Sequence, residues 1–310
     1  MRILVTGGTG MLGSTFDNIK RTDHTFTLVG SGQYDLTDYH TTVEMLTCTR
    51  PDAVIHLAAR VGGVKGNSDF VADFYSENIR MNTNVLDASR KCGVKKVLSL
   101  LSTCVYPDSA TYPLTEDQMH LGPPHKSNFG YAYAKRMLDV QSRTLREQYG
   151  CNFICAIPNN LYGPKDNFSI ETGHVIPAII RKIWESKINN TVPSFWGTGA
   201  ALREFTYSED IAQILIFMLE NYNEALPINI GLTNECSIKD VVQIVCDCLE
   251  YTGEVAWDVS KPTGQFRKPS SSERLFDIGW DDNSYTSLEE GIAKTCEWFK
   301  NEYPNVRGVN

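Results

Sequence analysis

The stretch Arg2–Gly13, which reads RILVTGGTGMLG, decides the fold of this chain. An apolar run typical of a buried strand, Arg2–Thr6, leads directly into glycines 7, 10 and 13, and a helical pattern follows over Gly10–Ile19. Glycines allow a tight turn, and they let backbone N–H groups approach a pyrophosphate at the positive end of the helix. A glycine turn without a ligand is the alternative, but the flanking strand and helix are the context that a dinucleotide site requires. The stretch therefore predicts a dinucleotide-binding β–turn–α unit.

Four further runs that are apolar at nearly every position follow the first. They are Phe26–Gly30, Ala53–Ala59, Lys96–Ser102 and Asn152–Pro158, and helical patterns accompany them at Thr41–Cys48, Phe74–Cys92 and Tyr131–Tyr149. Strands that helices cover on both faces have this composition. Repeated β–α–β units with right-handed crossovers predict an α/β fold with a doubly wound parallel sheet of the Rossmann type.

The second half of the chain is less regular and predicts a smaller α/β domain for a substrate. Helices are expected at His174–Ile188, Asp210–Leu219 and Ser237–Tyr251, a strand at Ile228–Gly231, a loop at Ser194–Gly199 and a long surface loop at Asp258–Ser272. Because no low-complexity linker separates the halves, we expect the two domains to be interleaved. Residues 1–165 and about 203–235 would form the dinucleotide-binding domain, and about 166–202 with 236–310 the substrate domain.

Composition and charge exclude several classes of protein. The 310 residues carry a net charge of −8, and such an acidic protein repels phosphate backbones, so nucleic acid is not an expected partner. No run approaches the roughly 18 apolar residues of a membrane span, and no signal peptide is recognisable. The nine cysteines form no C-x-x-C pair and have no zinc spacing. These features predict free thiols, no metal, no membrane and a cytoplasmic location.

The end of the second predicted strand bears on the choice of dinucleotide. An acid at this point usually binds the adenosine ribose of NAD, but this chain has Gly30-Ser31-Gly32-Gln33. The missing negative charge leaves room for a 2′-phosphate, so NADP is expected rather than NAD, although no arginine is present here to bind that phosphate. Asp35 and Leu36 follow and are expected to line the adenine pocket.

Tyr131 and Lys135 form a Y-x-x-x-K pair at the start of a predicted helix. The spacing places both side chains on one face. An unperturbed tyrosine has a pKa of about 10, and we expect the lysine ammonium and the positive nicotinamide to lower it. Ser102 ends a predicted strand at the carboxyl edge of the sheet, where ligands of this architecture bind. The three residues predict proton exchange with a substrate carbonyl or alcohol.

Several motifs together resemble the extended short-chain dehydrogenase/reductase family over nearly the whole chain. They are TGGTGMLG at 6–13, HLAA at 56–59, the strand-end Ser102 and YAYAK at 131–135. Further stretches resemble the nucleotide-sugar epimerase-reductases of that family: ARVGG at 59–63, STCVYP at 102–107, PNNLYGPKDNF at 158–168, HVIP at 174–177, FWGTG at 195–199, REF at 203–205 and KPTGQFRK at 261–268. The resemblance implies inversion of C3 and C5 of a GDP-linked 4-keto-6-deoxyhexose, followed by reduction at C4 with NADPH.

The resemblance also implies roles for individual residues. A ketone at C4 acidifies the protons on C3 and C5, and Cys104 as base with His174 as acid would exchange them, while Ser102 or Tyr131 holds the enolate oxygen. Residues implied to bind the nucleotide sugar are Cys104, Lys182, Trp196, Arg203 and Lys268. Residues implied to bind NADP are Gly7, Gly8, Thr9, Gly10, Met11, Leu12, Gly13, Ser31, Asp35, Leu36, Leu57, Ala58, Leu100, Leu101, Ser102, Tyr131, Lys135, Pro158, Asn159, Asn160, Leu161 and His174.

Two other functions remain open at this point. A UDP-hexose 4-epimerase of the same family would use NAD and share the glycine loop and the tyrosine–lysine pair, but it would need neither Cys104 nor His174. A non-catalytic NADP sensor would commonly lack Tyr131 or Lys135. Dehydratases of the superfamily carry an acid pair directly after the strand-end serine, where this chain has Thr103 and Cys104. Dehydration is therefore not expected.

The resemblance has one further implication and one departure. It implies a homodimer that forms through two long helices of each subunit, Phe74–Cys92 and Tyr131–Tyr149. Thr9 stands where related chains can carry an arginine in the glycine loop. That departure leaves the contact with the 2′-phosphate unassigned.

Overall fold

The computed structural model describes residues 1–19, 23–261 and 266–309. Its centre is a six-stranded sheet in the order β2-β1-β3-β4-β5-β9, in which every neighbouring pair is parallel. The strands are β1 (Arg2–Thr6), β2 (Thr25–Val29), β3 (Ala53–His56), β4 (Lys96–Leu100), β5 (Asn152–Pro158) and β9 (Ile228–Ile230). Since β2 and β3 lie on opposite sides of β1, the strand order reverses beside β1, which is where ligands of such sheets bind. The predicted doubly wound sheet is confirmed.

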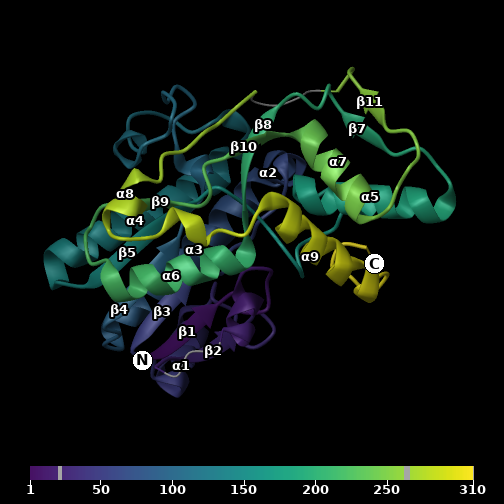
Figure 1. Ribbon diagram of the computed structural model, residues 1–310. Coiled ribbons are helices and arrows are strands. Elements are labelled where there is room, and N and C mark those ends of the chain that lie inside the picture. The colour runs from purple at the N-terminus through teal and green to yellow at the C-terminus, as the bar shows by residue number, and fades with distance from the viewer. Residues whose placement is uncertain (20–22, 262–265, 310) are drawn as a thin grey trace.

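Helices cover both faces of this sheet (Figure 1). One face carries α1 (Tyr39–Thr49), α3 (Val71–Lys91) and α4 (Phe129–Tyr149), and the other carries the 3₁₀ helix η1 (Gly13–Asn18), α6 (Ser208–Asn221) and α8 (Glu273–Asp277). β3 and β4 are buried at every residue, as expected for strands between two helical layers. The sheet therefore forms a rigid base for the loops at its carboxyl edge.

The rest of the chain forms a second assembly with its own apolar core. Two small sheets, in the orders β10-β8-β6 and β11-β7, contain β6 (Asn160–Tyr162), β7 (Ser194–Trp196), β8 (Leu202–Tyr207), β10 (Glu235–Ser237) and β11 (Ala256–Asp258). Their helices are α5 (Val175–Asn189), α7 (Ile238–Cys248) and α9 (Leu288–Glu302). Figure 1 shows β7, β11, α5 and α7 grouped at the upper right, with α9 below them. Phe168 and Phe299 stack at the centre of this core, with ring centroids 4.6 Å apart.

Short helices complete the connections, and local sequence explains where the long ones end. The short helices are α2 (Val64–Asp69), η2 (Thr103–Val105), η3 (Glu116–Gln118), η4 (Lys126–Asn128) and η5 (Asp282–Ser284). Asp38 caps α1 by accepting from the Thr41 N–H, and Ser237 with Asp240 forms a capping box at α7. Gly150 ends α4 in the left-handed region at φ 68°.

Three expectations about local structure are wrong. The helix predicted over 10–19 is a 3₁₀ helix that begins only at Gly13. The loop expected at 194–199 contains β7, because β11 pairs with it from far along the chain. The loop expected at 258–272 is not a surface loop throughout: Ser270 is buried, and Leu114 exchanges backbone hydrogen bonds with residues 269 and 271. Residues 262–265 of that loop lie outside the described residues.

The division into two domains stays a prediction. β8, expected to belong largely to the dinucleotide-binding domain, pairs with β6 and β10. Leu275 and Trp280, expected to belong to the substrate domain, pack against the core of the six-stranded sheet. The two assemblies thus exchange segments along the chain.

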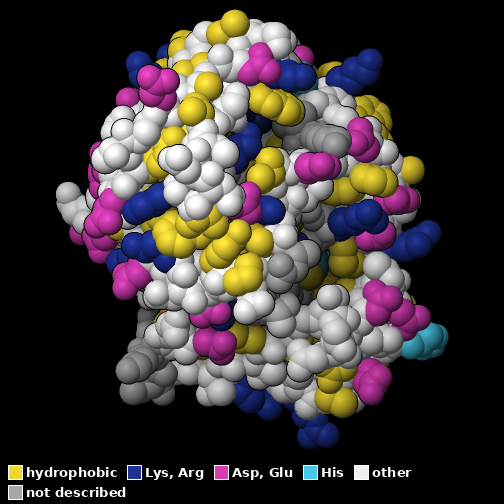
Figure 2. Space-filling view, turned by 90° about the vertical axis from the view of Figure 1, so that its right-hand side faces the viewer, with side chains coloured by type: hydrophobic (Ala, Val, Ile, Leu, Met, Phe, Trp, Pro, Cys, Tyr) yellow, Lys and Arg dark blue, Asp and Glu magenta, His cyan; other side chains and the backbone are white. Residues whose placement is uncertain are grey.

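The distribution of surface charges and the state of the cysteines are those of an ordinary globular protein. Figure 2 shows lysine and arginine side chains interspersed with acidic ones on the face that it displays. All nine cysteines are free thiols. Among the described residues, no helix is both long and apolar enough to cross a bilayer.

Candidate active site

The predicted site residues meet at the carboxyl edge of the parallel sheet. The glycine loop follows β1, Leu57 and Ala58 follow β3, and Ser102 and Cys104 follow β4. These strands are neighbours in the sheet, in the order β1-β3-β4. Because their carboxyl ends lie at one edge, the fold brings together motifs that are separated by about a hundred residues in sequence.

The glycine loop is packed so closely that larger residues would not fit. Gly7 has a φ of +71°, and a Cβ there would lie 2.9 Å from the backbone nitrogen of Ala58. A Cβ on Gly13 would lie 2.2 Å from the carbonyl oxygen of Gly7. Glycine at both positions therefore allows the loop to fold back against the end of β3.

The same loop fits a pyrophosphate. The N–H of Gly8 donates to Val29 O (2.8 Å) and that of Gly10 donates to Gly7 O (3.0 Å). The N–H groups of Met11 and Leu12 donate to no other group in the described part of the chain. Two adjacent unpaired donors at the end of β1 make a suitable site for an anion.

The end of β2 lies against Thr9 of the glycine loop. A Cβ on Gly30 would lie only 2.6 Å from Thr9 Oγ1, and the Gly30 N–H donates to Gln33 Oε1 (3.1 Å). The Asp35 carboxylate forms local hydrogen bonds, because its Oδ1 accepts from the N–H and the hydroxyl of Thr37. Thr9 and Ser31 are both exposed at this point and carry hydroxyl groups.

Lys135 and Tyr131 lie in the first two turns of α4, as the spacing predicts. The Lys135 side chain is buried, and its Nζ donates to Leu100 O at 2.8 Å, directly before the Ser102 loop. Burial lowers the pKa of Lys135 to about 8. The lysine thus links α4 to the end of β4, two residues before Ser102.

The pKa of Tyr131 differs from the sequence-based expectation. Burial raises this pKa above its ordinary value, a negative charge on neighbouring Cys104 raises it further, and hydrogen bonding to Ser102 lowers it. The net lowering that was expected from Lys135 and the nicotinamide is not found in the protein alone, because burial dominates. Tyr131 is therefore protonated at neutral pH and can act as a proton donor.

A buried polar network connects the glycine loop with the catalytic helix. His56 Nδ1 lies 2.8 Å from Thr6 Oγ1, and its Nε2 lies 3.1 Å from Asn82 Oδ1. Asn82 Nδ2 in turn donates to Ala134 O (3.0 Å), next to Lys135. Burial, followed by the Lys135 ammonium, lowers the pKa of His56 to about 3, so its ring is neutral. Sequence reasoning assigned no role to His56, although the HLAA motif was the available signal.

Cys104 lies in the short helix η2 and faces two potential partners. Its N–H donates to Ser102 Oγ (3.3 Å). A negative charge on its sulfur acts to raise the pKa of Tyr131 and that of Lys268. Lys268 comes from a distant part of the chain and donates through Nζ to Thr103 O at 2.9 Å. The structure thus brings Ser102, Cys104, Tyr131 and Lys268 together.

His174 immediately precedes α5 and is half-exposed. Its Nδ1 lies 3.9 Å from Oδ1 of Asp166, whose side chain is only 7% exposed. Hydrogen bonding to the Asp166 carboxylate, which accepts from the ring, raises the pKa of His174, and burial opposes this effect. Sequence reasoning missed Asp166, which lies inside the PNNLYGPKDNF stretch quoted above.

Three of the predicted nucleotide-sugar residues, Lys182, Trp196 and Arg203, lie in the second assembly. Lys182 on α5 donates to Ser194 O (3.0 Å) and lies over the Phe195 ring, 5.4 Å from its centroid. Trp196 of β7 is 60% exposed, which leaves its ring available for a ligand. Arg203 of β8 donates to the carbonyl oxygen of Leu202. Their assignment to a substrate stays a prediction.

Some predicted cofactor residues can contribute only through their backbone. The side chains of Leu36 and Leu101 are buried in the apolar core between the sheet and α3. The Asn159 side chain is occupied, since its Oδ1 accepts from Thr206 and its Nδ2 donates to Leu232 O. Pro158 ends β5, which pairs with β4, whereas Asn160 and Leu161 lie in β6, which pairs with β8. Whether these residues contact a cofactor stays a prediction.

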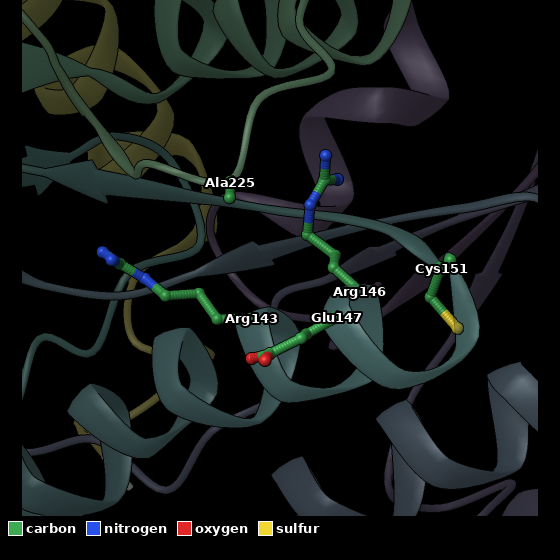
Figure 3. A pocket seen from close by; sticks show the side chains of 6 residues that line it. Arg143, Arg146, Glu147, Cys151 and Ala225 are labelled. Carbon is green, nitrogen blue, oxygen red and sulfur yellow. The ribbon is translucent and has the colours of Figure 1, made fainter.

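Two other clusters lie away from this site. A hollow lined by Arg143, Arg146, Glu147, Gly150, Cys151 and Ala225 lies at the opposite end of α4, and Figure 3 shows that its charged side chains point apart. Within the described residues, Asp23, His24 and Glu220 are close enough to hold a metal ion, but His24 Nε2 already contacts Glu220 at 2.9 Å. Neither cluster belongs to the carboxyl edge of the sheet.

A parallel sheet whose first turn suits a pyrophosphate, and whose carboxyl edge carries a tyrosine–lysine pair beside a serine, defines a dinucleotide-dependent enzyme of the short-chain dehydrogenase/reductase type. Comparison with known proteins identifies the family. The chain belongs to the NAD dependent epimerase/dehydratase family, whose profile matches residues 3–231.

Similar proteins share nearly the full length of the chain. The GDP-L-fucose synthase of Dictyostelium discoideum is 40% identical over 98% of this chain and 97% of its own length. The GDP-L-fucose synthase of Sinorhizobium fredii is 42% identical over 96% of this chain and 95% of its own. The crystal structure of a GDP-L-fucose synthetase from Naegleria fowleri bound to NADP is 39% identical, with a TM-score of 0.93 over 99% of this chain and 96% of that one.

Proposed function

We propose that this protein is a GDP-L-fucose synthase, which inverts C3 and C5 of GDP-4-keto-6-deoxy-D-mannose and then reduces C4 with NADPH. The observation that carries the proposal is a thiol in the reductase site. Cys104 follows Ser102 by two residues and is close enough to Tyr131 for a negative charge on its sulfur to raise the pKa of the tyrosine. Reduction alone has no need for a second proton-transfer group at this place. Similarity to synthases from several organisms supports the same conclusion.

Epimerisation needs a base, an acid and a donor to the enolate oxygen. Cys104 would remove the protons from C3 and C5, and in each case the resulting negative charge moves to the C4 oxygen. The protonated Tyr131, with Ser102, would stabilise that oxygen by hydrogen bonds. His174, whose pKa Asp166 raises, would return a proton on the opposite face.

Reduction uses the same oxygen-binding groups. NADPH, when bound, supplies the hydride that reduces C4. Tyr131 gives its proton to the developing C4 alkoxide, and Ser102 orients the carbonyl before transfer. The buried Lys135 ammonium favours the tyrosinate that remains, and it would also hold the nicotinamide ribose. One tyrosine can thus serve both half-reactions.

NADPH fits the cofactor site better than NADH does. The unpaired Met11 and Leu12 amides suit the pyrophosphate, and no acid ends β2 to repel a 2′-phosphate. The hydroxyl groups of Thr9 and Ser31 are the candidates to contact that phosphate. Lys182, Arg203 and Lys268 would bind the diphosphate of the nucleotide sugar, and Trp196 would cover the base or the sugar.

Exposed apolar side chains on two helices support a homodimer, and the free cysteines support a cytoplasmic location. α3 and α4 pack on each other and expose large apolar side chains, among them Tyr75 and Phe129, which are 40% and 52% exposed. A homodimer through these two helices would cover them. The free cysteines suit the reducing cytoplasm, where we place the protein.

The decisive experiment offers the purified protein GDP-4-keto-6-deoxy-D-mannose with NADPH. We expect loss of absorbance at the NADPH band and a product whose NMR couplings match GDP-L-fucose. A 4-epimerase of UDP-hexoses would leave the NADPH signal unchanged and interconvert UDP-glucose and UDP-galactose instead. A sensor would bind NADPH without any turnover. Either of these two outcomes would refute the proposal.

A further inference from the structure

The loop between β6 and α5 holds a buried carboxylate beside His174. Asp166 Oδ1 lies 3.9 Å from His174 Nδ1 and accepts from the Asn167 N–H at 2.6 Å. Asp166 Oδ2 is buried and has no hydrogen-bond partner among the described residues. A buried carboxylate oxygen without a partner is costly, so a neighbouring proton donor is needed to compensate for its charge.

The position of this carboxylate is fixed by contacts from other parts of the chain. The Phe168 N–H donates to Arg307 O (2.9 Å), and Arg181 donates to Gly308 O (2.6 Å), so the C-terminal residues brace the loop. On the other side, the Gly63 N–H donates to Thr172 O (2.9 Å). Asp166 is thus held in place before any ligand binds.

We propose that Asp166 is the positioning residue for His174: it accepts the Nδ1 proton and thereby leaves Nε2 to exchange a proton with the substrate. The inference rests on the proposed function, in which His174 is the acid of the epimerisation. The protons balance, because Nε2–H gives its proton to the carbanion carbon and solvent later restores it.

The charges around His174 favour this arrangement. The hydrogen bond and the negative charge of Asp166 raise the pKa of His174, whereas burial and the Arg307 guanidinium lower it, and the net direction is upward. His174 therefore stays charged to a higher pH than an isolated imidazole, whose pKa is about 6.5. The half-exposed ring remains accessible to a ligand.

The first test uses the wild-type protein and needs no turnover. NMR of ¹⁵N-labelled histidine, with the His174 signals assigned by His174→Gln, should show a midpoint above that of a free imidazole. In the neutral form, the proton should reside on Nδ1. A His174 that titrates at or below the ordinary value, or that is protonated on Nε2 when neutral, would overturn the inference.

The second test removes the negative charge of Asp166 and keeps the size of its side chain. In Asp166→Asn, the His174 midpoint should fall, and solvent deuterium incorporation into the substrate at neutral pH should slow by about 10²-fold. Asp166→Glu should restore much of both, and Glu297→Gln, on α9, should change neither. If Asp166→Asn does not fold, the tautomer in the wild-type protein and the Asp166→Glu titration still decide the matter.

Failure of the proposed function would look different. If the protein does not epimerise this substrate, deuterium incorporation is absent in the wild type too, but the His174 titration still responds to Asp166. A normal wild-type exchange rate that Asp166→Asn leaves unchanged refutes the positioning role alone.

Discussion

Lys135 Nζ donates to the carbonyl oxygen of Leu100 at a distance of 2.8 Å, and this bond joins the second turn of α4 to the end of β4. Leu100 lies two residues before Ser102, and Tyr131 lies one helical turn before Lys135, so the bond helps to set how closely Tyr131 approaches the serine. The buried ammonium also acts on His56 across the sheet. The hydrogen bond from Lys135 therefore links the helix that carries Tyr131 to the strand that leads into Ser102.

Removal of the Tyr131 hydroxyl should separate binding from chemistry. Tyr131→Phe should keep NADPH affinity within a few-fold and lose about 10²–10⁴ in the rate of C4 reduction, because a general acid is gone. Steady-state NADPH oxidation and fluorescence titration measure the two quantities. Tyr133→Phe is a matched control, since Tyr133 packs on Phe129 on the same helix. Reductase activity within a few-fold of wild type in Tyr131→Phe would rule out its role as acid.

Replacement of Cys104 should remove epimerisation and spare reduction. Wild-type protein without reductant should exchange hydrogen for solvent deuterium at both C3 and C5. Cys104→Ser should incorporate none, because a serine hydroxyl does not ionise usefully near neutral pH. With NADPH it should slowly form a 6-deoxy sugar of uninverted configuration. Cys48→Ser, at an exposed thiol, is the control. Wild-type deuterium incorporation at both carbons in Cys104→Ser would disprove the assignment.

An acid at the end of β2 should reverse the preference for coenzyme. The wild type should use NADPH with a kcat/KM at least about 10-fold above that for NADH, and Ser31→Asp should lower the NADPH value by a similar factor through repulsion of the 2′-phosphate. Ser31→Asn, which has nearly the same size and no charge, should retain most of the NADPH activity. Equal kcat/KM values for both coenzymes in the wild type would contradict the cofactor prediction.

The buried His56 should make the fold sensitive to acid. Its pKa is about 3 in the folded protein and about 6.5 when unfolded, so between these pH values the unfolded chain binds the extra proton. Its contribution to stability is complete above pH 6.5 and is lost as the pH falls through this window, by roughly 5 kcal/mol at most.

Urea unfolding at several pH values between 7 and 4 measures this contribution. His56→Asn should be less stable at pH 7, because the contacts with Thr6 and Asn82 change, and its stability should decline less steeply with acid. His40→Asn, at an exposed histidine, should follow the wild-type slope. Parallel slopes for wild type and His56→Asn would show that His56 does not carry the acid sensitivity.

The sequence by itself determined the parallel sheet, the glycine loop and the tyrosine–lysine pair. Each depends on short-range pattern: strands covered on both faces are continuous apolar runs, a turn that folds against a neighbouring strand requires glycine, and an i, i+4 pair shares one helix face. The sequence pattern predicted the ends of helices less well. An α-helix was expected over residues 10–19, but the short segment that follows the tight glycine turn forms the 3₁₀ helix η1.

Only the tertiary structure decided which distant groups meet at the site. Lys268 reaches Thr103 across 165 residues of sequence, β11 turns an expected loop into β7, and the C-terminal residues brace the loop that carries Asp166 and His174. The direction of the Tyr131 pKa was also decided there. Such properties depend on how much water the whole fold excludes and on which charges it leaves nearby, and no local pattern encodes either quantity.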